Sequence, residues 1–338
     1  MNARVPLSVL ELAPVSQGSD AAQALRDATA LAQTADERGY RRFWVAEHHA
    51  SETFMSSATS ILIAHVACHT SRIRLGSGGV MLPNHAPLMV AEYYGTLATL
   101  YGDRIDLGLG RAPGTDALTA RALHRGSGEI EAFAQNVVEI AHYLAEPNPQ
   151  QPLPVRAIPG EGTAVPIWLL GSSLGGASVA AYLGLPFSFA SHFAPDALVP
   201  ALDYYRQHFN PNAPTAQIER PYVMAGINVM CAPTDEEAAY LGTTAKRLTQ
   251  RILSGERAPL DPPDRALMSS GPRTDGAPGR PGMPVRAIGS PGKVVDKMQA
   301  FVDQHQLDEL IITTYAWDPV LRRRSFELLA DAWGMPGD

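Results

Sequence analysis

Three titratable residues, Glu47, His48 and His49, directly follow a short apolar run in the first part of the chain. The run covers residues 43–46 and is typical of a strand that is buried on both faces. Because unpaired charge is costly to bury, the titratable groups should lie just beyond the carboxyl end of that strand. Ligands bind at this end in parallel α/β folds, so His48 is a candidate acid–base residue. A solvated turn with one hydrogen-bonded histidine is the alternative.

Two glycine-containing turns are further candidates for chemistry. Residues 76–79 are Gly-Ser-Gly-Gly, and glycines permit the close approach of a flat ligand, although a bulge at a strand end is the alternative. Residues 171–176 are Gly-Ser-Ser-Leu-Gly-Gly between a predicted strand and a predicted helix, where N–H groups and hydroxyls favour a phosphate. Arg111 follows another predicted strand and could add a bidentate contact. A plain helix cap with glycines for packing is the alternative for the 171–176 turn.

The elements that must position these residues alternate between strand and helix. The eight predicted strands cover residues 5–12, 41–46, 73–76, 105–109, 167–170, 186–190, 222–230 and 309–313, and a helix follows each of them. This alternation favours an α/β fold with a parallel sheet. Eight such units in 338 residues fit a closed, eight-stranded parallel βα (TIM) barrel better than an open sheet.

Two segments rich in proline and glycine interrupt the alternation, near residues 146–166 and 255–290. The first is predicted to be a surface excursion. The second is too long for an ordinary loop, so we expect a functional lid or partial disorder. Composition does not shift on both sides of any boundary, which predicts one barrel domain over residues 1–338 with these two insertions.

Charge and composition exclude several classes of partner. The net charge is -7 without a basic run, so neither nucleic acid nor an anionic membrane surface is expected. Apolar runs fall short of the roughly 20 residues of a membrane span, and the N-terminus lacks a cleavable signal, so a cytoplasmic protein is predicted. Cys68 and Cys231 are far apart in apolar surroundings, which predicts two buried free thiols and no metal site.

Several segments of the chain together match a known family pattern. They are Glu-His-His after the second strand, SGGVMLP after the third, RIDLGLGRA at the fourth, and the later WLLGSS and AAYLGLPF. With these motifs the chain resembles the bacterial luciferase-like flavin-dependent monooxygenases over most of its length. Through SGGVMLPNHAP, GLGRAPGTD and SFASHFAPD it is similar to an uncharacterised luciferase-like monooxygenase subgroup.

The resemblance implies a barrel that binds reduced FMN, supplied by a separate flavin reductase, at the carboxyl ends of its strands. His48 matches the catalytic histidine of the family, and Glu47 or a neighbour would set its tautomer. Gly78 and Gly79 match a pair joined by a cis peptide bond against the flavin ring. The other predicted cofactor-binding residues are Glu47, Gly110, Arg111, Ser172, Ser173, Gly175 and Gly176. A second phosphate-binding arginine has no clear match, and Arg121 and Arg125 are the candidates.

The motifs do not identify the substrate. We expect a small organic molecule and molecular oxygen as substrates, and His49, Phe54, Met81 and His192 as candidates for the substrate pocket. A homodimer formed through early helices is also implied. Two alternatives remain, namely a deazaflavin-dependent oxidoreductase on the same fold and a non-catalytic flavin-binding subunit that pairs with an active partner.

Overall fold

A closed parallel barrel forms the centre of the molecule. The computed structural model describes residues 4–112, 114–150, 152–268 and 284–335. The barrel strands are β1 (Leu7–Glu11), β2 (Arg42–Val45), β3 (Arg74–Ser77), β5 (Ile105–Gly110), β6 (Ile167–Gly171), β7 (Phe187–Phe189), β8 (Val223–Cys231) and β10 (Glu309–Thr313). They pair in the order β10-β1-β2-β3-β5-β6-β7-β8, and the pairing of β10 with β8 closes the ring. The predicted eight-stranded parallel barrel is confirmed.

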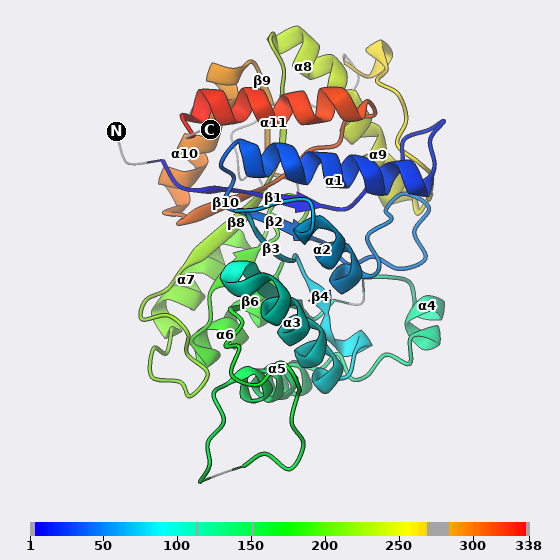
Figure 1. Ribbon diagram of the computed structural model, residues 1–338. Helices are drawn as coiled ribbons and strands as arrows, with labels where there is room; N and C mark the ends of the chain where they lie inside the picture. Colours follow the sequence, from blue (N-terminus) through cyan, green and yellow to red (C-terminus); the bar gives the residue numbers. More distant parts are fainter. Residues whose placement is uncertain (1–3, 113, 151, 269–283, 336–338) are drawn as a thin grey trace.

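Helices cover the outside of this barrel (Figure 1). They are α1 (Ala21–Glu37), α2 (Thr59–Ala67), α3 (Pro87–Tyr101), α4 (Ala117–Ala122), α5 (Ile130–Leu144), α6 (Leu174–Leu183), α7 (Leu198–His208), α8 (Asp235–Leu241), α9 (Thr243–Ser254), α10 (Pro291–His305) and α11 (Pro319–Trp333). Asp20 caps α1, because its carboxylate accepts a hydrogen bond of 2.7 Å from the Gln23 amide. The segment after β8 forms two helices in place of the one helix expected after each strand, and Gly242 separates α8 from α9.

Two short strands extend the sheet at the carboxyl end of the barrel. β4 (Val80–Met81) pairs with the end of β5, and β9 (Arg286–Gly289) pairs with the end of β8. β9 corrects the prediction for the 255–290 segment, because this part of it belongs to the sheet and not to a lid. Residues 269–283 of that segment lie outside the described residues. The described residues of the 146–166 insertion form a projecting loop without helix or strand, as predicted (Figure 1).

The two cysteines lie in different surroundings. Cys231 is buried at the end of β8, as expected, whereas Cys68 is exposed. The prediction for Cys68 was wrong because this residue follows the last turn of α2, where the apolar side of the helix no longer covers it. Among the described residues, the helices are all too short or too polar to cross a membrane.

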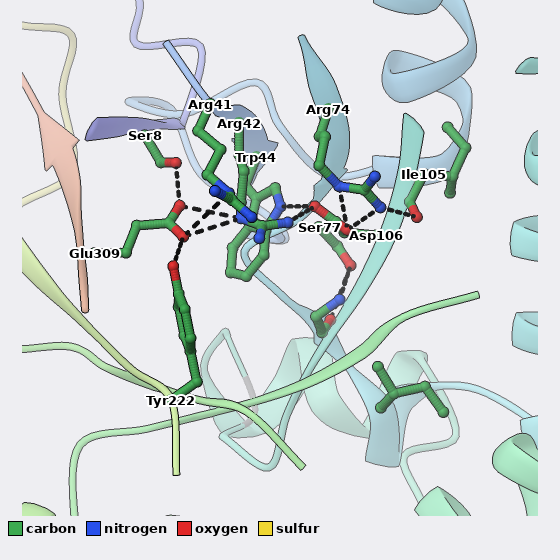
Figure 2. A network of polar contacts seen from close by, with 12 residues as sticks. Ser8, Arg41, Arg42, Trp44, Arg74, Ser77, Ile105, Asp106, Tyr222 and Glu309 are labelled. Carbon is green, nitrogen blue, oxygen red and sulfur yellow. Dashed lines mark hydrogen bonds and ion pairs between the residues drawn. The ribbon is translucent and has the colours of Figure 1, made fainter. Parts of the chain in front are cut away.

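A network of buried charges fills the barrel at the amino ends of the strands (Figure 2). Arg42 donates from Nη1 to Oδ2 of Asp106 at 2.6 Å and from Nε to Oε1 of Glu309 at 3.0 Å. The two carboxylates also accept hydrogen bonds from Ser8, Trp44, Arg74 and Tyr222. Each buried charge therefore has an opposite charge beside it, which offsets the cost of its desolvation. The sequence pattern of these strands indicates apolar strands and gives no sign of this network.

An apolar layer lies within the barrel and forms a cluster separate from the main core. Its buried members are Leu10, Leu12, Trp44, Ala46, Trp168, Met224 and Ile311. The rings of Trp44 and Trp168 pack edge to face with centroids 5.2 Å apart, which is a favourable geometry for a pair of aromatic rings. Leu10 and Ile311 also line the cavity described below, so this layer gives the cavity an apolar wall.

Candidate active site

The carboxyl ends of the strands surround a cavity of about 960 Å³. The predicted site residues that line it are His48, Phe54, Gly78, Gly79, Met81, Gly110, Arg111, Ser172, Ser173, Gly176 and His192. Glu47, His49 and Gly175 were predicted with them but do not line the cavity. The barrel thus gathers residues from β2, β3, β5, β6 and β7 into one site, as expected for a parallel α/β barrel.

Glu47 is fully buried and hydrogen-bonds to two histidines other than His48. Its Oε1 lies 2.7 Å from Nε2 of His49 and 2.9 Å from Nε2 of His85. Its Oε2 accepts a hydrogen bond of 3.1 Å from the Met81 amide. Adjacent side chains of extended backbone point to opposite sides, so Glu47 and His49 face one way while His48 faces the cavity. This corrects the expectation that Glu47 binds cofactor or sets the tautomer of His48.

The hydrogen bonds to Glu47 also determine its charge. Burial raises the pKa of its carboxyl group, but the contacts with His85, His49 and the Met81 amide more than offset this, and the pKa lies below its usual range. Ligand atoms of Glu47, His49 and His85 lie within 4.8 Å of one another. The hydrogen bonds from His49 and from His85 to the Glu47 carboxylate account for this proximity.

His48 presents an imidazole that has little support from protein groups. Its Nδ1 is buried without a hydrogen-bond partner among the described residues, and its ring centroid lies 5.3 Å from that of Phe54. The backbone is fixed, because the His48 amide donates to the Ser56 carbonyl oxygen at 3.0 Å. Burial lowers the pKa of His48, against an opposing effect of Glu47. The ring is therefore neutral near pH 7 and can accept a proton.

His192 is a second neutral imidazole at the same cavity. Burial, with a smaller effect of His48, lowers its pKa to about 4, and its Nδ1 has no hydrogen-bond partner in the described residues. The ring packs on the backbone of β8, where a Cβ added to Gly226 would lie 2.1 Å from Nδ1. The glycine at this position is what leaves room for the imidazole.

Gly78 and Gly79 form a closely packed wall between β3 and β4. The peptide bond between them is cis, so this prediction is confirmed. A Cβ on Gly79 would lie 2.7 Å from the Gly108 carbonyl oxygen, and one on Gly78 would lie 2.5 Å from Cδ1 of Leu10. These contacts explain why larger residues do not fit, and they leave a flat backbone surface at the cavity.

Two arginines stand beside the amino end of α6. Arg111 donates from Nη1 to the Gly128 carbonyl oxygen at 3.0 Å, and Arg125 donates from Nη2 to the Arg111 carbonyl oxygen at 2.8 Å. Arg111 and Arg125 line the cavity, whereas Arg121 does not. Neither Arg111 nor Arg125 pairs with a carboxylate among the described residues.

The turn before α6 places two serine hydroxyls at the cavity, and neither has a hydrogen-bond partner in the part of the chain that the structure describes. Ser173 is the N-cap of α6, yet its side chain makes no capping hydrogen bond, and Ser172 and Ser173 both line the cavity. The positive end of the helix dipole and two arginines therefore converge on one polar region. Gly175 and Gly176 serve packing, since a Cβ on Gly176 would lie 3.1 Å from Cα of Gly171.

One part of the cavity wall, contributed by α9 and β9, was not predicted from the sequence. Leu248, Thr249 and Ile252 of α9 line the cavity, and so does Arg286 of β9. The α9 residues belong to a helix that was predicted, but nothing in its sequence indicates that this helix contacts the cavity. The sequence gives one weak indication of β9, because Arg286 is followed by a short apolar run. The proline- and glycine-rich residues around this run do not predict a strand.

Comparison with known proteins agrees with this geometry. Residues 5–305 match the family model described as luciferase-like monooxygenase. The chain belongs to the luciferase-like monooxygenase family. A protein of Escherichia coli (strain K12) named luciferase-like monooxygenase is 42% identical over 330 residues, covering 97% of this chain and 96% of that protein. The N-acetyl-S-alkylcysteine monooxygenase of Bacillus subtilis (strain 168) is 30% identical and covers 97% of this chain and 98% of its own.

Solved structures of this family share the barrel. The crystal structure of apo-MsnO8 superposes with a TM-score of 0.90 at 36% identity, covering 99% of this chain and 100% of its own. More distant structures agree in fold alone. They include the oxygenating constituent of 3,6-diketocamphane monooxygenase in complex with FMN, with a TM-score of 0.71 at 17% identity. An F420-dependent secondary alcohol dehydrogenase has a TM-score of 0.69 at 12% identity.

Proposed function

We propose that this protein is an FMN-dependent monooxygenase that uses reduced FMN and molecular oxygen to oxygenate a small organic substrate. One oxygen atom would enter the substrate and the other would leave as water, with reduced FMN as the electron donor. The observation that supports this best is the arrangement of one cavity. It has an arginine-rich polar end at Arg111 and Arg125, a flat glycine wall at Gly78–Gly79, and neutral His48.

The residues at the polar end fit the phosphate of FMN. Arg111 and Arg125 lack carboxylate partners in the described residues, and Nε of Arg125 is buried without a hydrogen bond. A phosphate there would receive charge-assisted hydrogen bonds from the arginines, the hydroxyls of Ser172 and Ser173, and the first amides of α6. The Gly78–Gly79 surface would support the ring system. Reduced FMN supplies the electrons and the site of reaction with oxygen when it is bound.

His48 would then act as a base or proton shuttle on the substrate side of the cavity. Its lowered pKa keeps it neutral, so that it accepts a proton near neutral pH. The apolar side chains of Leu10 and Ile311 exclude water from the wall of the cavity. Exclusion of water protects reactive species from unproductive decay.

A deazaflavin-dependent oxidoreductase is the alternative, because the fold is shared with an F420-dependent dehydrogenase. A non-catalytic flavin-binding subunit is a second alternative, and the neutral His48 side chain at the cavity argues against it.

The proposal includes two protein partners. A separate reductase would supply reduced FMN, and a homodimer would form through α2 and α3, where Met89, Tyr93 and Leu100 of α3 are exposed apolar residues.

Anaerobic titration with reduced FMN, reduced riboflavin and reduced F420 tests the proposal. We expect FMN to bind at least tenfold more tightly than riboflavin, because only FMN carries the phosphate. Oxygen labelled with ¹⁸O should then label products only when reduced FMN is the donor. Tighter binding of F420 than of FMN would contradict the proposal, and so would equal binding of FMN and riboflavin.

A further inference from the structure

Arg286 is a cation at the active-site cavity for which the described residues provide no counter-ion. Its Nη2 donates a hydrogen bond of 2.8 Å to Oγ1 of Thr249, and its Nε is buried without a partner. Both residues line the cavity. Burial lowers the pKa of the guanidinium group, and no carboxylate from residues 4–112, 114–150, 152–268 or 284–335 counteracts this, yet an arginine stays protonated.

The two arginines that are fully buried among the described residues, Arg42 and Arg322, have carboxylate partners, whereas half-buried Arg286 has none. Arg42 pairs with Asp106 and Glu309, and Arg322 pairs with Glu11. Such pairing is expected, since a partly buried cation without an anion is unfavourable. Because the described part of the chain places no anion beside Arg286, this position points to a group that arrives with a ligand.

The position of Arg286 separates it from the proposed phosphate end. Arg111 and Ser172 follow β5 and β6, which are neighbours in the barrel. Arg286 lies on β9, level with Asn228 of β8, so β7 and β8 separate it from β6. One phosphate already has two arginines at its own end, so a third cation three strands farther along the sheet fits a second anionic group.

The surroundings of Arg286 define the rest of the ligand. The cavity lining from α9, from the loop after β7 and from the segment that leads into β9 is largely apolar, and comprises Phe193, Leu248, Ile252, Leu253 and Pro284. We propose that Arg286 binds the carboxylate of the substrate, which would be an organic acid with an apolar body. This inference rests on the proposed function, because it assigns the substrate class of the same cavity.

Isothermal titration calorimetry with paired probes tests the assignment on the full chain, with and without FMN. The probes are phenylacetate, 3-phenylpropanoate and 4-phenylbutyrate, each compared with its own neutral amide. At least one acid should bind the parent protein about tenfold or more tightly than its amide. Arg286→Met should bring the acid to the affinity of its amide and leave the amide unchanged, while Arg286→Lys should restore part of the preference.

Arg247→Met is the matched control, because Arg247 lies on the same helix as Thr249 but does not line the cavity. It should leave the preference for the acid intact. The assignment is wrong if no acid in the series is preferred over its amide, or if the preference survives Arg286→Met. It is also wrong if Arg286→Met weakens FMN but not riboflavin, since Arg286 would then hold the phosphate. A failure of the proposed function can be distinguished from a failure of this assignment. If the proposed function is wrong, the parent protein will bind FMN and riboflavin with equal affinity.

Discussion

Glu47 and His49 are joined by a hydrogen bond of 2.7 Å between Oε1 and Nε2, and His48, which lies between them in the sequence, points the other way into the cavity. The two adjacent histidines therefore have different surroundings. His49 belongs to a buried polar cluster with His85, whereas His48 meets the ligand space. Substitutions of the two residues should have different effects for this reason.

His48→Ala should retain the fold and the affinity for FMN, because the side chain makes no hydrogen bond that the structure needs. Product formation from a true substrate should fall at least about a hundredfold, which is typical of the loss of an acid–base group. Single-turnover measurement of oxygenated product checks this result. Product formation at the parent rate would show that His48 has no role in proton transfer.

Glu47→Ala should act on stability instead. The change leaves His49, His85 and the Met81 amide without their buried acceptor, which costs roughly 2–4 kcal/mol in the free energy of unfolding. Urea denaturation compares this variant with His48→Ala, which should lose clearly less. Equal losses for the two variants would mean that the Glu47 cluster does not stabilise this part of the barrel.

Arg111→Ala should weaken FMN by about 10- to 100-fold and leave riboflavin nearly unchanged, since the lost contact is to the phosphate. Arg121→Ala serves as the control, because Arg121 is on α4 away from the cavity. Fluorescence titration with both flavins measures the effect. A parallel loss for FMN and riboflavin would indicate damage to the fold and not the loss of a phosphate contact.

The stability of the protein should fall as the pH decreases from 6.5 towards 4. His192 has a pKa of about 4 in the folded state, against an ordinary value of 6.5, so the unfolded chain binds more protons within this window. The full contribution of this group is about 3 kcal/mol, and it is present above pH 6.5. His192→Gln should flatten the dependence, although His48 beside it also titrates. A difference between the variant and the parent that is constant from pH 4.5 to 7 would contradict this account.

Gly79→Ala should destabilise the barrel by roughly 1–3 kcal/mol, because the new Cβ would lie 2.7 Å from the Gly108 carbonyl oxygen. Gly292→Ala provides the comparison. A Cβ at that position on α10 meets nothing within 4 Å, and alanine is the better helix former. Thermal or urea unfolding should therefore rank Gly292→Ala at or above the parent and Gly79→Ala below it. The reverse order would show that the wall at Gly78–Gly79 is loosely packed.

The barrel could be predicted because each βα unit is a local pattern, in which an apolar run precedes a helix with a clear start. The direction of His48 followed from the alternation of side chains once β2 was placed. Long-range partners had no such pattern. Arg42 and Glu309 are 267 positions apart in the sequence, and nothing near either residue indicates their contact. Arg286 was hidden in the same way, since only the pairing of β9 with β8 brings it to the cavity.

A crystal structure of the protein with FMN tests the central claim most directly. The account predicts the phosphate within hydrogen-bond distance of Arg111 and Arg125 and of the turn at Ser172 and Ser173. The ring should lie against Gly78–Gly79, with His48 at its edge and the space in front of Arg286 left free for substrate. A phosphate bound at Arg286, or a ring that lies away from His48, would contradict the account.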